Sequence, residues 1–188
     1  RAQRISQRSF IELAKKKKAY MKTSPVLWCT ECQTSIAQAE LETKECETVF
    51  NYLNFTTPIG NLLIATTRPE LLAGCACIFV HPDDTRYKKF IGQKAIVPLY
   101  DFEIPILADD TVAMDKGTGV VMCASFGDSA DVEWYQKHKL TSKEVILADG
   151  TISEKIDFIG KMTVKKARAY IIELLKKQNL LVKQETIR

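Results

Sequence analysis

Seven short apolar runs, separated by turn residues, are the feature that most limits how this chain of 188 residues can fold. Runs of this length that are bounded by Gly, Pro, Asn or Asp are typical of β-strands. Several are apolar at consecutive positions, so both faces of the strand must be covered, as in a closed barrel or a covered sheet. The predicted strands are Val49–Phe55, Leu62–Ala65, Ala76–Val80, Ala95–Pro98, Glu103–Leu107, Gly119–Cys123 and Val145–Leu147.

The longer helices that the sequence predicts lie outside this set of strands. The first covers roughly residues 6–20 and should end before Pro25, because a residue that precedes proline is pushed out of the helical region. The last begins after Thr163, which can cap it, and ends near Asn179, with apolar side chains at helical spacing between them. We expect a mixed, mainly β fold: a closed β-barrel core with peripheral α-helices. Shorter elements are predicted over residues 69–73, 84–90 and 129–139 (helices) and 180–182 (a strand).

Charge is distributed unevenly along the chain, although the net charge is only +4. Residues 1–22 carry +7 and residues 163–188 carry +5, whereas residues 23–162 carry −8. We expect a single domain over residues 1–188, with the basic ends as helical flanks and the acidic middle as the barrel core. The lysine run at residues 15–18 is typical of a solvated face, although such a run can also bind a nucleic-acid backbone.

Cysteine content and hydropathy bear on the compartment and on cofactors. No apolar run approaches the ~20 residues of a membrane helix, and no signal peptide is recognisable, so we expect no membrane partner. Six cysteines without a secretion signal favour a reducing compartment, the cytoplasm. Cys29 and Cys32 form one CxxC pair, which is half of a zinc site. Because no second pair is spaced to match, we predict no metal and no other cofactor.

The motifs of several enzyme classes are missing from the sequence. The chain has no HExxH, GxSxG or GxxxxGK[ST] motif, which argues against a zinc hydrolase, an α/β serine hydrolase and a P-loop enzyme. It also lacks the HIGH and KMSKS signatures of nucleotide-activating synthetases. We therefore expect no amino-acid activation site in this chain, which would then be a fragment of a larger enzyme.

Two polar clusters remain as candidates for chemistry, and the first is Thr66-Thr67-Arg68-Pro69-Glu70, directly after a predicted strand. It could simply cap a short helix, with Pro69 in the first turn and Glu70 facing the free amides. It could equally expose two hydroxyls and a guanidinium to a phosphate or an ester at a strand-to-helix corner.

The second cluster is Gly117-Thr118-Gly119, followed after a predicted strand by Asp128 and Asp131. Asp128 could cap a helix that begins at the next residue, with Asp131 three residues later as in a capping box. Two carboxylates at the exit of a strand could also bind a cation such as an α-ammonium group. Neither cluster decides the function alone.

Taken in order along the chain, the clusters and several shorter motifs resemble the editing (connective peptide) domain of the valyl-tRNA synthetases, in the class I aminoacyl-tRNA synthetase family. The resemblance covers nearly the whole chain, with an entry segment at Ser24–Glu40 and an exit segment at Gly160–Lys183. Isoleucyl enzymes typically place Pro-Trp after the threonines, and leucyl enzymes lack the block that begins at His81. The matching motifs are Ala65–Glu70, Val80–Asp84 with Arg86-Tyr87, Ile104–Ile106, Gly117–Gly119 and Asp131.

This resemblance implies an activity, the hydrolysis of threonine wrongly esterified to the valine tRNA. It implies two partners: the 3′ end of tRNA(Val) carrying misacylated threonine, and the rest of a parent synthetase. Asp131 matches the aspartate that holds the α-ammonium group of the substrate, and Thr67 and Arg68 match catalytic positions beside the ester. The implied substrate-binding residues are Thr66, Glu70, Gly117, Thr118, Gly119 and Asp128, without a metal.

The sequence departs from the commonest bacterial pattern of that family at four places. Leu71 stands where a third threonine is usual, Lys116 where phenylalanine is frequent, and Met122 where lysine is frequent. The run 125–128 stands where Pro-Ala-His-Asp is familiar. Two alternatives remain open: an isoleucyl-type editing domain that clears Val-tRNA(Ile), and a non-catalytic tRNA-binding module.

Overall fold

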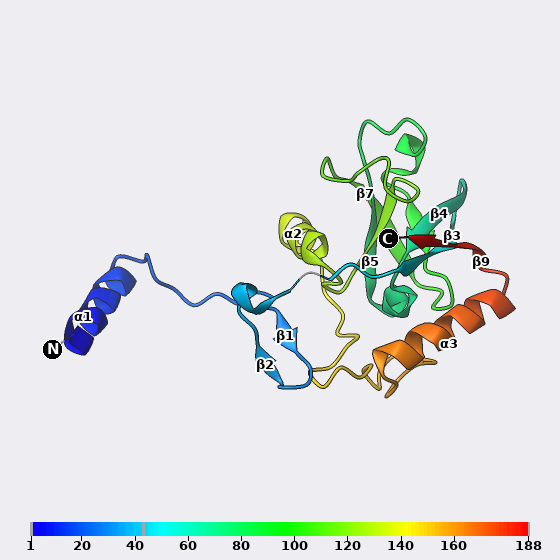
Figure 1. Cartoon of the computed structure of the whole chain (residues 1–188). Helices are drawn as coiled ribbons and strands as arrows, with labels where there is room; N and C mark the ends of the chain where they lie inside the picture. The colour runs from blue at the N-terminus through cyan, green and yellow to red at the C-terminus, as the bar shows by residue number, and fades with distance from the viewer. Residues whose placement is uncertain (1, 43, 188) are drawn as a thin grey trace.

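A computed structural model of the chain describes residues 2–42 and 44–187 (Figure 1). Its strands are β1 (Trp28–Cys29), β2 (Thr34–Ser35), β3 (Thr48–Thr57), β4 (Gly60–Thr66), β5 (Cys75–Val80), β6 (Lys94–Ile96), β7 (Glu103–Ala108), β8 (Val120–Ala124) and β9 (Leu181–Ile187). Its α-helices are α1 (Ala2–Lys15), α2 (Ser129–His138) and α3 (Val164–Lys177). Its 3-10 helices are η1 (Gln38–Glu40), η2 (Pro69–Gly74) and η3 (Lys88–Phe90). The prediction of a mainly β fold with peripheral helices is confirmed.

Seven of the strands form one sheet that curls into a nearly closed barrel. Hydrogen bonds connect them in the order β4-β3-β6-β7-β5-β8, and β9 pairs with the first half of β3. Neighbouring strands are antiparallel except β5 and β7, which run parallel. The end strands β4 and β8 lie against each other but are not paired within the described residues. The predicted barrel core is therefore confirmed, with a seam between these two strands.

Apolar side chains fill the barrel and also attach α2 to its outside. Consecutive side chains of a strand point to opposite faces. Accordingly, Ile78 and Val80 of β5 enter the main core, whereas Cys77 and Phe79 pack with Trp134 of α2 in a second cluster. This packing fixes α2 against the barrel, with its first turn just beyond the end of β8.

The C-terminal segment packs more closely than its basic composition suggests. The apolar stripe of α3 is buried at Ala167, Ile171 and Leu175, and α3 packs on η2. The chain then returns as β9, which pairs antiparallel with β3. The sequence predicts residues 163–188 as a flank, but as far as residue 187 the structure makes this segment part of the barrel's packing.

The N-terminal helix α1 has the opposite character. It has no buried residue, and a stretch without helix or strand separates it from β1 and the barrel (Figure 1). Its apolar side chains Ile5, Phe10 and Ile11 are exposed. Among the helices described, none is both long and apolar enough to cross a membrane.

Other element boundaries differ from the predictions where tertiary contacts decide them. The strand predicted over residues 145–147 is reduced to a single bridge outside the main sheet. The helix predicted over residues 84–90 is reduced to η3. The strand predicted over residues 180–182 continues to Ile187, because β3 provides a partner for its polar half.

Candidate active site

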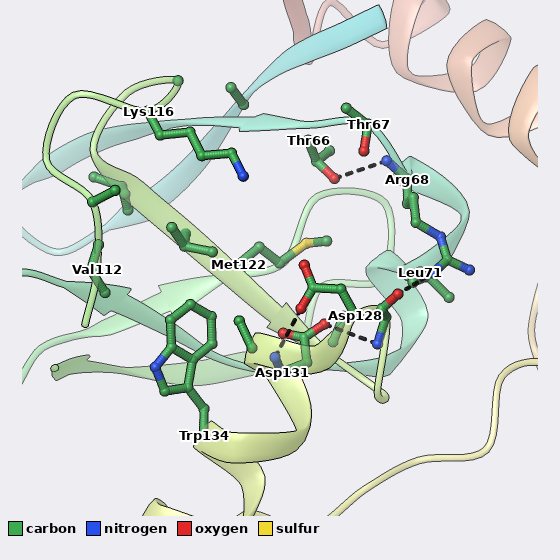
Figure 2. A pocket seen from close by; sticks show the side chains of 18 of the residues that line it. Thr66, Thr67, Arg68, Leu71, Val112, Lys116, Met122, Asp128, Asp131 and Trp134 are labelled. Carbon is green, nitrogen blue, oxygen red and sulfur yellow. Dashed lines mark hydrogen bonds between the residues drawn. The ribbon is translucent and has the colours of Figure 1, made fainter. Parts of the chain in front are cut away.

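A cavity of about 540 Å³ opens beside the seam between β4 and β8 (Figure 2). Its walls come from the end of β4 and the corner that follows it, the loop before β8, β8 itself, and the first turns of α2. Three of the predicted site residues, Glu70, Thr118 and Gly119, do not line the cavity. The fold brings the two polar clusters of the sequence to one place. The predicted site residues that line it are Thr66, Thr67, Arg68, Gly117, Asp128 and Asp131.

Asp131, in the first turn of α2, is a nearly buried carboxylate that faces the cavity. It is only 7% exposed, and its Oδ2 accepts a hydrogen bond from the Gly127 amide at 2.9 Å. Burial and, next, the charge of Asp128 raise the pKa of Asp131 to about 6. Within residues 2–42 and 44–187 no cation forms an ion pair with Asp131. The site therefore holds a largely ionised carboxylate near pH 7 whose charge no neighbouring cation neutralises.

Asp128 is the N-cap of α2, as the sequence predicts, and its Oδ1 accepts the Asp131 amide at 2.9 Å. The second half of the predicted capping box differs. The carboxylate of Asp131 accepts the amide of Gly127, one residue before the N-cap. A Cβ on Gly127 would lie 2.7 Å from Asp131 Oδ2, so glycine is needed for this contact. Gly127 lines the cavity and is a site residue that the sequence analysis missed.

The corner between β4 and η2 presents two threonines and an arginine to the cavity (Figure 2). Thr66 Oγ1 accepts the Arg68 amide at 3.1 Å, which shapes the corner. The guanidinium of Arg68 crosses to the opposite wall and donates to the carbonyl oxygen of Gly127 at 2.5 Å. It also donates to Glu70 at 3.5 Å, which still leaves N–H donors for a ligand. The hydroxyl of Thr67 has no hydrogen-bond partner within the described residues and lies on the cavity wall.

Glu70 has a structural position rather than the predicted substrate-binding one. Its side chain is fully buried and accepts two hydrogen bonds from Arg168 of α3, at 2.9 and 2.8 Å. This bidentate contact raises the pKa of Arg168 above its usual value. The carboxylate therefore connects η2 to α3. One interpretation of the sequence expects Glu70 to face the free amides of η2, and the structure does not show that contact.

Thr118 and Gly119 shape the loop before β8 without lining the cavity, and Thr118 Oγ1 accepts the Val120 amide at 3.4 Å. A Cβ on Gly119, whose φ is +81°, would lie 2.7 Å from both Arg86 Nη2 and the Met114 carbonyl oxygen. Arg86 donates to that carbonyl at 2.7 Å while it forms a bidentate pair with Asp84, at 2.9 and 2.6 Å. The geometry thus gives these two predicted binding residues a role in the conformation of the loop.

A polar network supports another wall of the cavity. Asp109 is buried and lies 2.6 Å from His138 Nε2, 2.6 Å from Thr111 Oγ1 and 3.0 Å from Lys137 Nζ. Burial opposes the ionisation of Asp109, but the hydrogen bonds from these neighbours outweigh it and hold its pKa below the usual range. Thr111 Oγ1 accepts the indole N–H of Trp134 at 2.8 Å, and both residues line the cavity. The sequence offered no local signal for this network.

The cysteines supply neither a nucleophile nor an evident metal site. A hydrogen bond with Cys77 and burial raise the pKa of the Cys123 thiol, and burial raises that of Cys75, so these thiols stay protonated. Cys29 and Cys32 lie at the β1–β2 turn, outside the cavity lining. In the part of the chain that the structure describes, no group of three or more His, Cys, Asp or Glu could hold a metal ion. The absence of a cofactor stays a prediction.

Known proteins resemble this chain at the level of sequence. A family model described as "Leucyl-tRNA synthetase, editing domain" matches residues 85–173. The valine–tRNA ligase of Rickettsia typhi is 49% identical over 189 residues, which covers 99% of this chain and 23% of the relative. That of Ehrlichia canis is 43% identical over 194 residues, covering 98% and 24%. The chain spans about a quarter of the length of these curated relatives.

Two solved structures share the fold. The agnB2 LeuRS of Agrobacterium radiobacter K84, in a ternary complex with tRNA and LeuAMS, has a TM-score of 0.60 at 19% identity. The match covers 75% of this chain and 20% of that one. GlLeuRS-CP1 has a TM-score of 0.58 at 13% identity, over 72% of this chain and 99% of that one. At such identities the likeness extends to the fold alone.

Proposed function

We propose that this chain is an editing domain of the valyl-tRNA synthetase family and that its cavity hydrolyses the ester of threonine misattached to tRNA(Val). Its partners are then the 3′ end of the misacylated tRNA(Val) and the rest of a parent synthetase. The observation that carries the proposal is the charge of Asp131, which is buried at the cavity and has no cation beside it among the described residues.

The need for such a site follows from the shapes of valine and threonine. In valyl-tRNA synthetase, the established example, a hydrophobic pocket built for valine rejects the nearly isosteric threonine by only about 100-fold. A second, hydrolytic site improves accuracy if it recognises the threonine hydroxyl with polar groups. Valine, which lacks that hydroxyl, leaves those polar groups unpaired and is disfavoured.

Asp131 suits the α-ammonium group of an aminoacyl ester. An ionised carboxylate that is buried without a partner is unfavourable, and a ligand ammonium would supply the missing charge. A bound cation also lowers the pKa of Asp131 from about 6, which keeps the carboxylate ionised throughout the neutral range. The ester then lies between α2 and the β4–η2 corner.

The reaction requires only water and correct placement. Water attacks the ester carbonyl carbon, the C–O bond to the ribose breaks, and the ribose oxygen leaves as a hydroxyl with the proton that the water gives up. Arg68 has N–H donors free to stabilise the developing negative charge, and the Thr67 hydroxyl and the neighbouring ribose hydroxyl are available to orient the water. The mechanism uses neither a histidine base nor a thiol nucleophile.

Three of the departures from the common bacterial pattern, Leu71, Lys116 and Met122, line the cavity. The Lys116 side chain extends into the cavity (Figure 2). Within the described residues its ammonium group has no hydrogen-bond or ion-pair partner, so it is available to a polar group of the ligand. Leu71 and Met122 make the adjoining wall apolar.

Deacylation assays with three RNAs test the proposal. The chain of 188 residues should hydrolyse Thr-tRNA(Val) and should spare Val-tRNA(Val), and Asp131→Asn should remove most of the activity. Preferential hydrolysis of Val-tRNA(Ile) would instead assign the chain to the isoleucyl type. If tRNA binds but no ester is hydrolysed faster than in buffer, the chain is a binding module.

A further inference from the structure

A second cavity, of about 430 Å³, adjoins the first on the far side of Arg68. The two cavities share Arg68 and Leu71, and the contact from the Arg68 guanidinium to the Gly127 carbonyl stands between them. One ligand can therefore occupy both cavities if it passes over this contact or displaces it. The remaining lining includes Ser125, Phe126, Glu144 and Ile146.

The turn that connects β8 to α2 has an unusual backbone conformation at two residues that line the second cavity. Ser125 and Phe126 have φ values of +40° and +54°, a region that residues other than glycine seldom adopt. Several bonds fix the turn: the Ser125 amide donates to Tyr135 Oη at 3.0 Å, and Ser125 Oγ lies 2.5 Å from the Lys143 carbonyl oxygen and 3.2 Å from that of Gly74. Strain that the surroundings hold in place in this way clusters at functional sites.

This conformation presents the Phe126 ring to solvent. The residue is 40% exposed and packs against Tyr135, with ring centroids 4.7 Å apart and the planes inclined at 51°. The ring is thus held from one side by an aromatic neighbour and remains accessible at the second cavity. An exposed aromatic ring held in this way is the usual platform on which single-stranded RNA bases stack.

We propose that Phe126 is a stacking platform for a nucleobase of the RNA 3′ end while the ester lies in the first cavity. This proposal rests on the proposed function, because that function supplies the RNA. The neighbouring Glu144 carboxylate, which has no hydrogen-bond or ion-pair partner in the described part of the chain, can accept a hydrogen bond from the exocyclic amino group of cytosine or adenine. The terminal CCA of a tRNA offers such a group on each base.

The test compares Phe126→Ala with Phe126→Tyr and with a matched control, Phe158→Ala. Phe158 is also exposed (53%), also has a positive φ (+70°) and also packs on a tyrosine, with centroids 5.7 Å apart, but it lines neither cavity. The first measurement is the equilibrium binding of unacylated CCA trinucleotide, which needs no hydrolysis. The second is kcat/KM for threonyl esters of adenosine, of CCA and of tRNA(Val).

Loss of one stacked base should weaken CCA binding about tenfold in Phe126→Ala. Phe126→Tyr and Phe158→Ala should bind within about twofold of the parent chain, since a tyrosine ring stacks as phenylalanine does. A loss of activity on the adenosine ester identifies the terminal base as the one that stacks, whereas a loss on CCA and tRNA esters alone identifies its neighbour. Equal CCA binding by the parent and Phe126→Ala would overturn the proposal. Failure of the parent to hydrolyse any ester, with CCA binding still sensitive to Phe126, would overturn only the proposed function.

Discussion

Replacing Asp131 by asparagine should make the chain more stable and inactive at the same time. Asparagine keeps the shape of the side chain and can still accept the Gly127 amide, which now bonds to Asp131 Oδ2 at 2.9 Å. It removes the charge of a residue that is only 7% exposed. The change therefore isolates the free energy of holding that charge in the folded chain.

The magnitude follows from the pKa of Asp131, which burial raises from 3.8 to about 6. Each unit of difference between the folded and unfolded chain corresponds to about 1.4 kcal/mol, so the ionised form destabilises the fold by about 3 kcal/mol. The size of this destabilisation depends on pH. Below pH 3.8 both states are protonated and the difference vanishes; from there to pH 6 the folded chain retains a proton that the unfolded chain has released, so stability falls as pH rises. Above pH 6 the difference is constant.

Urea denaturation of the parent and Asp131→Asn at pH 5 and pH 8 measures this effect. The free energy of unfolding of Asp131→Asn should exceed that of the parent by about 3 kcal/mol at pH 8 and by roughly half of that at pH 5. Asp128→Asn is the matched control: asparagine is an equally good N-cap and removes only the second cause of the raised pKa, so its gain in stability at pH 8 should be clearly smaller than that of Asp131→Asn. If Asp131→Asn is no more stable than the parent at pH 8, the reasoning about the buried charge is refuted.

Three further changes test other contacts of the site. Arg168→Gln leaves the buried Glu70 carboxylate with only the 3.5 Å contact from Arg68, so it should lower the free energy of unfolding by about 3 kcal/mol in urea denaturation, and the double change with Glu70→Gln should recover much of that loss. Gly127→Ala places a Cβ 2.7 Å from Asp131 Oδ2, so it should lower kcat/KM for Thr-tRNA(Val) at least about tenfold while the fold, followed by circular dichroism, is retained. Asp128→Asn removes the neighbouring negative charge that helps to raise the pKa of Asp131, so the acid limb of the pH–rate profile should move below pH 6. An unmoved limb would show that this charge is screened by solvent.

The local features of the fold could be predicted from the sequence, because local patterns determine them. Strands β3 and β4 and α2 with its Asp128 cap follow from short apolar runs bounded by turn residues and from capping chemistry. The polar half of β9 could not be predicted in this way, since Lys183–Ile187 has no strand-like alternation and is held by pairing with β3. For the same reason, α3 looks like a solvated basic flank until its packing on η2 is known.

The candidate site, like the fold, could be predicted only where local patterns in the sequence determine it. Its two polar clusters can be recognised in the sequence because the residues of each lie close together along the chain. That the two clusters lie at one site was predicted only from the family resemblance, and no local pattern indicates it. The partners were not visible: Arg68 reaches the Gly127 carbonyl across 59 positions, and Glu70 meets Arg168 across 98. A sequence cannot distinguish a glutamate that faces a ligand from one that pairs with an arginine in a distant helix. Gly127 was missed because the need for glycine arises from a close approach and not from a turn with positive φ.

Two buried carboxylates, Glu70 and Asp131, differ in whether a cation of the chain pairs with them. Glu70 is fully buried and is neutralised by Arg168, whereas Asp131 is nearly buried and no cation within the described residues neutralises it. A charge left unpaired at a cavity favours a ligand cation, but every aminoacyl ester carries the same ammonium group. On the proposed function, Asp131 therefore explains why an aminoacyl ester binds and cannot explain why threonine is chosen over valine. That choice requires polar groups elsewhere in the cavity. The geometry offers the Thr111 hydroxyl, which Trp134 and Asp109 already orient, and the ammonium of Lys116, which has no partner among the described residues.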